Sequence, residues 1–371
     1  MIDHVPVEPF HPGEYINDEM EARGWTQDDL ADVMGITRRQ LVNLIQGKSG
    51  VTPDTAHRLA GAFGQDAETW MHLQVAFEIA VAAKEDRDVA QKAKIYDKVP
   101  VRELKRRRWI ADVNDADALE SEVCRFLGVS DIDDPVSYSA AARKGTSYDT
   151  HLPAQRAWYC RVRELAKHVT AARYDESRFE EGVSHLLSLS SDPDDARKIP
   201  RALSDMGVRL VIVERLKGTR IDGVALWLSD HEPVIGLSLR YDRIDNLWFN
   251  LMHEMVHIKH RDESPVDVDL SQDVPCDLSE MEQRANAEAA DYLVPRDKLD
   301  SFIQRHRPLY YQKKVVQFAQ ARGVHPAIVV GQLKRHGGLP ESHLNKIQAK
   351  IRDVIRGQAL TDGWRDVPTL R

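Results

Sequence analysis

The sequence predicts an α+β fold that is mostly helical, and three observations support this class. A capped helix-turn-helix pattern lies near the N-terminus, at residues 26–46. Three short β-rich runs lie between residues 208 and 239. Residues 247–260, LWFNLMHEMVHIKH, follow these runs, and the spacing of their histidines indicates a metal site. The chain has 371 residues, which is enough for two or three domains with ample cores.

The N-terminal pattern carries the start and stop signals of short helices. Thr26 and Gly35 bound the first helix, as N-cap and C-terminal glycine. Thr37 begins a second helix that runs to residue 46, and Thr52 with the following proline begins another. The side chains of the second helix expected to point toward the core are Leu41, Val42, Leu44 and Ile45. We therefore expect an all-α helix-turn-helix domain over residues 1–84.

The outward face of the second helix carries side chains that read base edges. Arg, Gln and Asn form paired hydrogen bonds with guanine and adenine in the major groove. The residues predicted to contact DNA are Gln27, Thr37, Arg38, Arg39, Gln40, Asn43 and Lys48. Residues 1–84 contain 13 acidic and 6 basic side chains, so the domain lacks an overall basic field. A solvated helix face, in a protein-binding or vestigial module, is therefore the alternative.

Several local motifs accompany this pattern. They are His11-Pro12-Gly13-Glu14, the helix-turn-helix itself, Gly47-Lys48 and Trp70-x-x-Leu73-Gln74. Together, residues 10–77 resemble the HigA branch of XRE-type repressors. The resemblance implies an antitoxin and autorepressor that binds operator DNA as a homodimer. A toxin is a possible partner of such an antitoxin, but no toxin can be inferred from one sequence.

His253, Glu254 and His257 interrupt an otherwise apolar helix. Imidazoles at positions i and i+4 lie on one helix face, about a turn apart, so both can bind one zinc ion with the Glu254 carboxylate near a bound water. The flanking residues are apolar on nearly every side, which predicts a buried helix whose titratable groups need partners. The alternative is that two core histidines have this spacing by chance.

A third protein ligand, which leaves a fourth position open for water, is expected in the next helix downstream. Glu282 is the leading candidate, and Glu280 and Glu288 are its rivals. Ser279 and Glu282 also fit a capping box, in which the glutamate only hydrogen-bonds the helix start. Asn286 lies one turn further along the same face, where it can accept a hydrogen bond from the ring N–H of a ligating histidine.

The β-rich runs that precede the metal-motif helix predict a small sheet. They are Val208–Glu214, Ile221–Leu228 and Val234–Leu239. An exposed sheet edge beside the metal would bind an extended peptide by main-chain hydrogen bonds. The sequence does not say which strand forms that edge.

Three features follow one another along the chain. They are the three predicted strands, the H-E-x-x-H helix, and the motif E-x-x-A-N-x-x-A-A-x-x-L-x-P from Glu282 to Pro295. The arrangement resembles the ImmA/IrrE metallopeptidases, which are gluzincin-like proteases that cleave partner transcriptional repressors. The resemblance implies a zincin-like domain with Zn2+ bound by His253, His257 and Glu282, and Glu254 as general base. We expect this core at residues 201–300. Glu288 departs from the family pattern, which usually has an aromatic residue there.

The rest of the chain is expected to be a helical linker region at residues 85–200 and a helical extension at 301–371. Two helices are predicted within residues 315–333, and residues 357–371 are expected to be loosely ordered.

The chain has no secretory segment or bilayer-spanning apolar run, and its three cysteines are scattered, so we expect a cytoplasmic protein without a membrane partner. The net charge of −8 restricts nucleic-acid contact to a local surface.

These observations favour a DNA-binding transcriptional regulator with zinc-dependent endopeptidase activity, whose substrate is a partner repressor or regulatory protein. One alternative is a HigA-type antitoxin or repressor whose zinc domain senses or binds without proteolysis. Another is a metallopeptidase that uses its helix-turn-helix only for protein docking. The intact H-E-x-x-H favours hydrolysis, because a purely structural site does not need Glu254. A smaller hypothesis places a Cys276 thiolate in the open zinc position of a resting enzyme.

Overall fold

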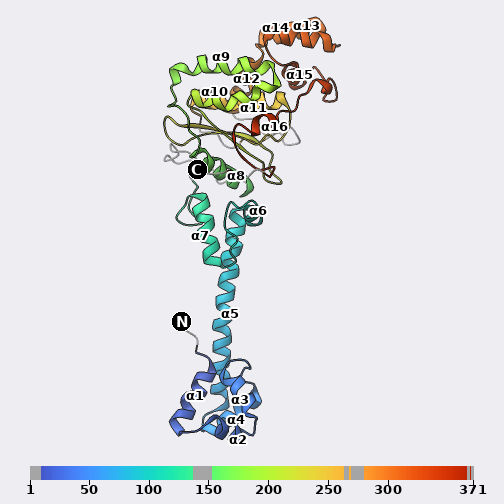
Figure 1. The fold of residues 1–371 in the computed structure, drawn as a ribbon. Coiled ribbons are helices and arrows are strands. Elements are labelled where there is room, and N and C mark those ends of the chain that lie inside the picture. The colour runs from blue at the N-terminus through green and yellow to red at the C-terminus, as the bar shows by residue number, and fades with distance from the viewer. Residues whose placement is uncertain (1–9, 137–152, 263–266, 269–279, 366–367, 369–371) are drawn as a thin grey trace. The chain divides into compact units, whose positions relative to one another are not determined.

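The computed structural model describes residues 10–136, 153–262, 267–268, 280–365 and 368 (Figure 1). The described part is mostly helical with one small sheet, which confirms the predicted α+β class. The chain divides into two compact units, residues 1–94 and 95–371. The division falls inside the long helix α5, ten residues beyond the boundary that the sequence suggested. None of the described helices is long and apolar enough to cross a membrane.

The described part of the N-terminal unit is built from five helices, of which α2, α3 and α4 begin at the predicted threonine caps. They are α1 (Pro12–Arg23), α2 (Gln27–Met34), α3 (Arg38–Ile45), α4 (Pro53–Phe63) and α5 (Ala67–Lys98), which continues into the second unit. Thr26, Thr37 and Thr52 each accept a hydrogen bond from a backbone N–H of the first helical turn. Gly35 ends α2 with a φ of 63°, a left-handed conformation that favours glycine.

The core of this unit explains which side of α3 is free. Leu41 and Leu44 are buried in it, together with residues of the other helices such as Ile16, Leu30 and Trp70. Val42 was expected to point inward but is only half-buried. Only a narrow face of the eight-residue α3 packs against α1 and α2.

The second unit combines a five-stranded sheet with helices on both faces. Its strands are β1 (Arg209–Val213), β2 (Ile221–Trp227), β3 (Pro233–Leu237), β4 (Asp267–Val268) and β5 (Leu360–Asp362). Their order across the sheet is β4-β2-β3-β1-β5. β1 runs parallel to β3 and β5, whereas β2 runs antiparallel to β3 and β4. The three strands predicted from the β-rich runs are confirmed.

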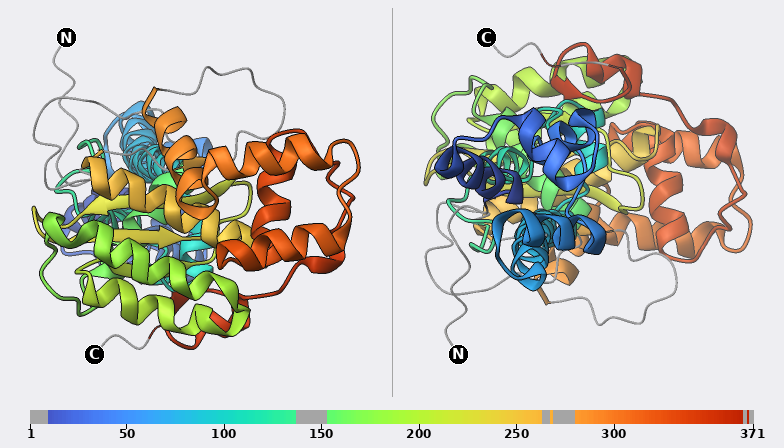
Figure 2. Two further views of the ribbon diagram at one scale, coloured as in Figure 1. Left: turned by 90° about the horizontal axis from the view of Figure 1, so that it is seen from above. Right: turned by 90° about the horizontal axis from the view of Figure 1, so that it is seen from below.

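The helices of this unit are as follows: α6 (Val101–Arg106), α7 (Ala116–Leu127), α8 (Pro153–Ala166), α9 (Phe179–Ser188), α10 (Ile199–Asp205), α11 (Ile244–His260), α12 (Glu280–Leu293), α13 (Arg296–His306), α14 (Gln312–Arg322), α15 (Pro326–Arg335) and α16 (Arg352–Arg356). Short 3-10 turns lie at Glu176–Arg178, Leu189–Ser191, Pro193–Lys198 and Asn345–Ile347. Helix α8 covers one face of the sheet, and α10 and α11 cover the other (Figure 1). The orange helices α13 to α15 lie to one side of these layers (Figure 2). The two helices predicted within residues 315–333 are confirmed as α14 and α15.

The period-two alternation along β1 sorts its side chains between two cores. Leu210 and Ile212 join the core beneath α10 and α11, whereas Val211 and Val213 join the core that contains Trp158 of α8. Helices α6 to α8 therefore share a core with the sheet, although the sequence placed them in a linker region. Sequence periodicity shows that a helix has an apolar face, but it does not show which element that face contacts.

The expectation of a loosely ordered end from residue 357 onward was wrong for the described residues. Strand β5 pairs with β1, and the Asp362 side chain is buried. Its carboxylate accepts hydrogen bonds from Trp109 Nε1 at 3.0 Å and Arg161 Nε at 2.6 Å. These contacts span more than 200 residues of sequence, so local patterns do not reveal them.

Candidate functional site

Helix α11 holds the central motif in the interior of the second unit. Apolar residues surround it, and the side chains of His253, Glu254 and His257 are no more than 1% exposed. The helix packs against β2 and β3 on one side and against α12 and α15 on others. The predicted burial of this helix is confirmed, and three titratable side chains lie within its apolar packing.

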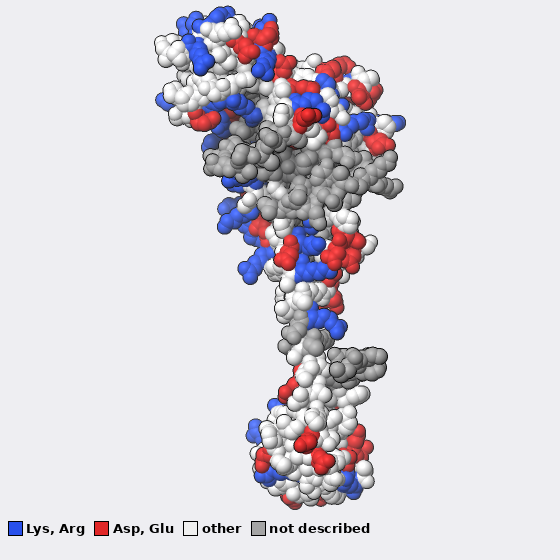
Figure 3. Space-filling model, turned by 180° about the vertical axis from the view of Figure 1, so that it is seen from behind, with Lys and Arg blue, Asp and Glu red and all other residues white. Residues whose placement is uncertain are grey.

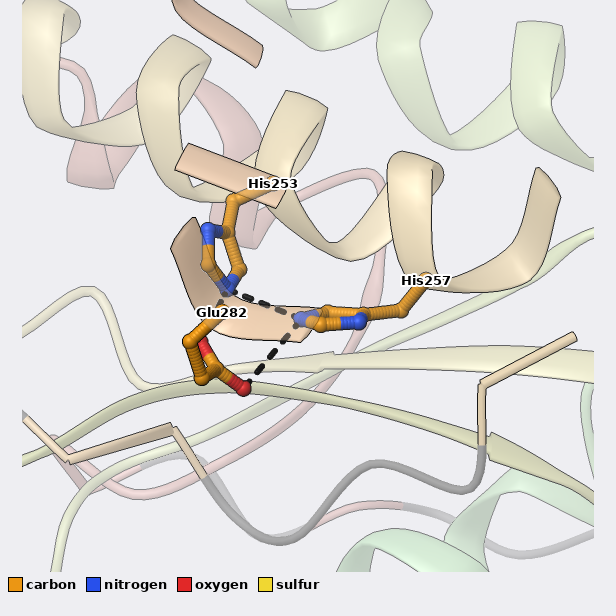
Figure 4. Close-up of side chains that lie close together, drawn as sticks. All are labelled: His253, His257 and Glu282. Carbon is orange, nitrogen blue, oxygen red and sulfur yellow. Dashed lines mark hydrogen bonds and ion pairs between the residues drawn. The ribbon is translucent and has the colours of Figure 1, made fainter. Parts of the chain in front are cut away.

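The structure brings together the three residues predicted as zinc ligands (Figure 4). The Nε2 atoms of His253 and His257 are 3.0 Å apart. Glu282, which α12 supplies, places Oε2 3.2 Å from His253 Nε2 and Oε1 3.5 Å from His257 Nε2. Two imidazole nitrogens and a carboxylate that converge in this way form a donor set suited to zinc. The residues present therefore fit the metal that the motif implies.

The rival acidic residues lie elsewhere. Glu288 forms ion pairs with His260 at 2.8 Å and Lys259 at 3.5 Å, because six residues along a helix separate it from the face of Glu282. Glu280 is exposed. Ser279, the other half of the capping-box alternative, lies outside the described residues, as does Cys276.

Asp262 holds the second histidine in place, a role that the sequence analysis did not foresee. Its Oδ2 lies 3.0 Å from Nδ1 of His257, and Arg284 of α12 donates to both Asp262 oxygens at 2.7 Å. A carboxylate at Nδ1 keeps the proton there and directs the lone pair of Nε2 toward the metal position. No hydrogen bond joins the predicted Asn286 to either imidazole within the described ranges. Asp262 directly follows Arg261, whose left-handed backbone (φ 53°) ends α11 and turns the chain back toward the histidine.

The electrostatics favour the ligand forms of these side chains. Burial lowers the pKa of His257, and the charge of His253 lowers it further, so the imidazole is neutral near pH 7. Burial alone would raise the pKa of Glu282, but its hydrogen bond to His253 and the charges of both histidines hold it below its ordinary value. Neutral imidazole and ionised carboxylate are the states that bind a metal.

Strand β2 passes directly beside the carboxylate of Glu254. A Cβ atom added at Gly223 would collide with Glu254 Oε1, so glycine is required by close approach. Glu254 follows His253 on α11, and its carboxylate lies between the helix and this strand. The structure thus identifies β2 as the strand next to the site.

The predicted DNA-reading residues lie on and around α3. Arg38, Arg39 and Lys48 are exposed, and Asn43 is half-buried. Gln40 is exposed, but its Oε1 accepts hydrogen bonds from the backbone N–H and the hydroxyl of Thr37, at 2.9 and 2.8 Å. This capping box leaves only the amide NH2 of Gln40 for a base.

Charge on the N-terminal unit is mixed, as its composition indicates. On the face shown in Figure 3, acidic and basic side chains are interspersed over this unit. Arg38 itself lies 3.4 Å from Asp28 of α2, and both side chains are exposed. The remaining predicted residue, Gln27, is half-buried at the start of α2. Any DNA contact at α3 therefore depends on local side chains.

Comparison with known proteins agrees with this division. Residues 16–70 match the helix-turn-helix family, and residues 205–333 match the family of IrrE N-terminal-like domains. Antitoxin HigA-1 of Vibrio cholerae serotype O1 is 36% identical over 72 residues, which are 19% of this chain and 68% of that protein. Virulence-associated protein I of Dichelobacter nodosus is 29% identical over 81 residues, which are 22% of this chain and 75% of that protein.

Among solved structures, the Pseudomonas aeruginosa antitoxin HigA with the higBA promoter is similar to part of this chain. It is 27% identical, with a TM-score of 0.21, over 22% of this chain and 91% of that one. The curated relatives and both family matches assign the two parts of the sequence separately. The chain therefore belongs, through its N-terminal domain, to the helix-turn-helix family of XRE type with HigA antitoxin relatives, and it carries an IrrE N-terminal-like peptidase domain toward its C-terminus.

Proposed function

We propose that this chain is a DNA-binding transcriptional regulator whose second unit is a zinc-dependent endopeptidase that cleaves a partner repressor or regulatory protein. One observation carries the proposal. The ligand atoms of His253, His257 and Glu282 all lie within 4.8 Å of one another, with Glu254 buried on the same helix between the histidines. This is the arrangement of three protein ligands and a general base that hydrolytic zinc sites use.

The chain's own residues supply most of the chemistry. Zinc held by the three ligands would lower the pKa of a water molecule and polarise the peptide carbonyl. Glu254 takes the proton of the attacking water and then protonates the leaving amine nitrogen. Asp262 keeps His257 in the required tautomer, and burial excludes bulk water around Glu254. An extended peptide would pair with β2 beyond the two described residues of β4, which pair with Ile221 and Gly223, because β2 passes beside Glu254.

The N-terminal unit would bring the peptidase to its substrate by binding operator DNA. We propose that the face of α3 reads an operator with Arg38, Arg39, Gln40 and Asn43, while Gln27, Thr37 and Lys48 contact the backbone around it. A homodimer would place two such helices on two half-sites. Binding at an operator would raise the local concentration of a neighbouring repressor toward the millimolar range that short tethers give, so even a slow protease would act selectively.

The test compares the wild type with Glu254→Gln, each loaded with one equivalent of zinc. Both are incubated with a native extract of folded proteins, and new N-termini are identified by mass spectrometry. We expect termini that appear with the wild type and disappear with Glu254→Gln or a chelator. Glu288→Gln is the matched control, because Glu288 pairs with His260 away from the ligands, and it should retain the wild-type cleavage pattern.

One other function has support of its own. The identity to antitoxin HigA-1 over the N-terminal unit favours an antitoxin or repressor whose zinc domain binds or senses without hydrolysis. In that case the wild type and Glu254→Gln would repress their own promoter equally and neither would generate new termini. A toxin partner would then be recovered with both proteins.

A further inference from the structure

A cavity of about 530 Å3 lies next to the candidate metal centre and has no role in the chemistry described above. Helix α11 contributes Asn246, Phe249 and Asn250 to its wall, α15 contributes Gln332, and β2 contributes Asp222. The volume exceeds what one large side chain occupies. The cavity can therefore hold a residue of a bound peptide together with water.

Three relationships connect this cavity to the reacting groups. Asn250 lies one helical turn before Glu254, so the two side chains project from adjacent positions on α11. The Phe249 ring contacts the His253 imidazole, with 6.2 Å between ring centroids. Asp222 directly precedes Gly223, the residue against which the Glu254 carboxylate packs. A peptide whose scissile bond lay at the ligands would place a neighbouring side chain in this cavity.

The described polar side chains of the wall comprise three amides, six charged groups and Tyr241. Asn246 and Asn250 are half-buried and make no side-chain hydrogen bond to any residue that the structure describes. Gln332 is 3% exposed, and its Nε2 donates to the carbonyl of Ala290 at 3.1 Å. Its Oε1 lacks a partner within the same ranges. Three amides that both donate and accept thus border one space.

The charged side chains of the wall already have partners, so the cavity offers less to a charged side chain. Asp222 lies 3.9 Å from Arg240, and Glu341 lies 3.9 Å from Lys334. The Arg335 guanidinium lies over the Phe249 ring. Arg243 is held by two hydrogen bonds from its guanidinium to Asp245, at 3.1 and 2.6 Å. Lys334 donates to the carbonyl of Glu341 at 2.7 Å and to Asn345 Oδ1 at 2.6 Å. A purely apolar side chain would cover the amides and leave them without partners, which disfavours it.

We propose that this cavity is a specificity subsite for an uncharged, hydrogen-bonding side chain, glutamine or asparagine, next to the scissile bond. The inference rests on the proposed peptidase function and adds the class of residue that the site selects. A carboxamide side chain presents one acceptor and two donors, which match the free donors and acceptors of the asparagines and the Oε1 of Gln332. Asn250 and Gln332 are the residues that determine the preference.

The experiment uses the full chain with one equivalent of zinc and a pool of synthetic decapeptides randomised at every position. Cleaved bonds are mapped by mass spectrometry for the wild type, Asn250→Leu and Gln332→Leu. We expect glutamine and asparagine to be enriched over leucine at one position beside the cut in the wild type. Each variant should shift that ratio toward leucine, on the order of tenfold, the effect of leaving one buried polar group unpaired. Gln320→Leu, on the exposed face of α14, is the matched control and should keep the wild-type profile.

A second measurement separates failure of the subsite from failure of the peptidase. The same pool is captured on zinc-loaded Glu254→Gln, with and without the Asn250→Leu change, and the bound peptides are sequenced. If the wild type cuts no peptide, the proposed function fails on these substrates, yet enrichment of glutamine and asparagine among captured peptides still supports the subsite. Cleavage with the wild-type residue preference in both leucine variants overturns it. Capture with the same preference with and without Asn250→Leu also overturns it, and so does the absence of any capture. Circular dichroism checks that Gln332→Leu, the more buried change, is folded.

Discussion

The carboxylate of Asp262 lies 3.0 Å from Nδ1 of His257 and accepts two hydrogen bonds from Arg284 on the helix that carries Glu282. This chain of contacts joins one histidine of α11 to α12 without passing through the metal position. It fixes the ring whose Nε2 points toward His253 and Glu282. The geometry of the candidate site therefore depends on a residue that lies just beyond the end of α11.

Replacing Asp262 should weaken zinc binding while leaving all three ligands in place. Loss of the partner that orients a ligating histidine lowers metal affinity by about 10–100-fold. Competition titrations of Asp262→Ala against a chromogenic chelator measure this change. Asp300→Ala, an exposed carboxylate on α13, is the control and should match the wild type. Equal zinc affinity of Asp262→Ala and wild type would contradict the positioning role.

The third ligand is tested by metal content. Glu282→Ala should lose the bound zinc, because two imidazoles alone seldom make a stable site, whereas Glu288→Ala should retain about one zinc per chain. Inductively coupled plasma mass spectrometry of the purified proteins gives both values. Full zinc occupancy in Glu282→Ala would show that another residue completes the site.

Gly223→Ala should damage hydrolysis without removing the metal. The added methyl group would meet Glu254 Oε1, so the carboxylate or β2 must shift, while none of the three ligands is among the atoms nearest to the new Cβ. We expect peptidase activity to fall by at least tenfold with unchanged zinc content. Gly357→Ala, where no atom lies within 4 Å of the new Cβ, should behave like the wild type. Full activity in Gly223→Ala would mean that Glu254 acts from a different position.

The DNA-reading face is tested on the chain's own promoter region. Arg38→Ala and Arg39→Ala should each weaken specific binding by about 1–3 kcal/mol, the value of a lost paired contact with a base. Lys48→Ala should weaken binding to all sequences and reduce the salt dependence of affinity by about one charge. Gel-shift titrations at several salt concentrations distinguish these effects, with Arg305→Ala on α13 as the control. An unchanged affinity in both arginine variants would exclude this face.

Acid should destabilise the metal-free protein. The folded-state pKa of His257 is lowered from 6.5, so the unfolded chain binds a proton more readily, and stability present above pH 6.5 is lost as the pH falls below it. The lowered pKa of Glu282 acts in the same direction below its ordinary value of 4.5. Urea denaturation of the apo protein at pH 7.5 and pH 5.5 should give a lower midpoint at pH 5.5. A His257→Leu variant should lose part of that difference, and an identical pH response in both proteins would exclude His257 as its source.

Local sequence signals predicted much of the fold. Threonine caps and terminal glycines act within four residues, so they predicted where α2, α3 and α4 begin and where α2 ends. The spacing of His253 and His257 fixes their relation on one helix, and Glu282 lies on the next helix, which packs against α11. These features depend on local geometry or on elements that are adjacent in the chain.

The rest depends on contacts between distant segments. Asp362 pairs with Arg161 across 201 residues, and Gly223 meets Glu254 between a strand and a helix. A lone aspartate or glycine carries no signal for such a contact, because many residues of these types serve turns and surfaces. The cavity beside the metal centre was missed for the same reason, since Asn250 and Gln332 are 82 residues apart and lie on different helices.

We propose that the chain cuts a regulatory partner with Glu254 as the catalytic base. The most direct measurement is to co-express the wild type or Glu254→Gln with the products of the adjacent genes and to search for a partner fragment by intact-protein mass spectrometry. We expect a defined fragment with the wild type and an intact, co-purifying partner with Glu254→Gln, at equal zinc content. If both proteins leave every partner intact under all inducing conditions and repress the promoter equally, the endopeptidase account is wrong and the zinc domain serves binding alone.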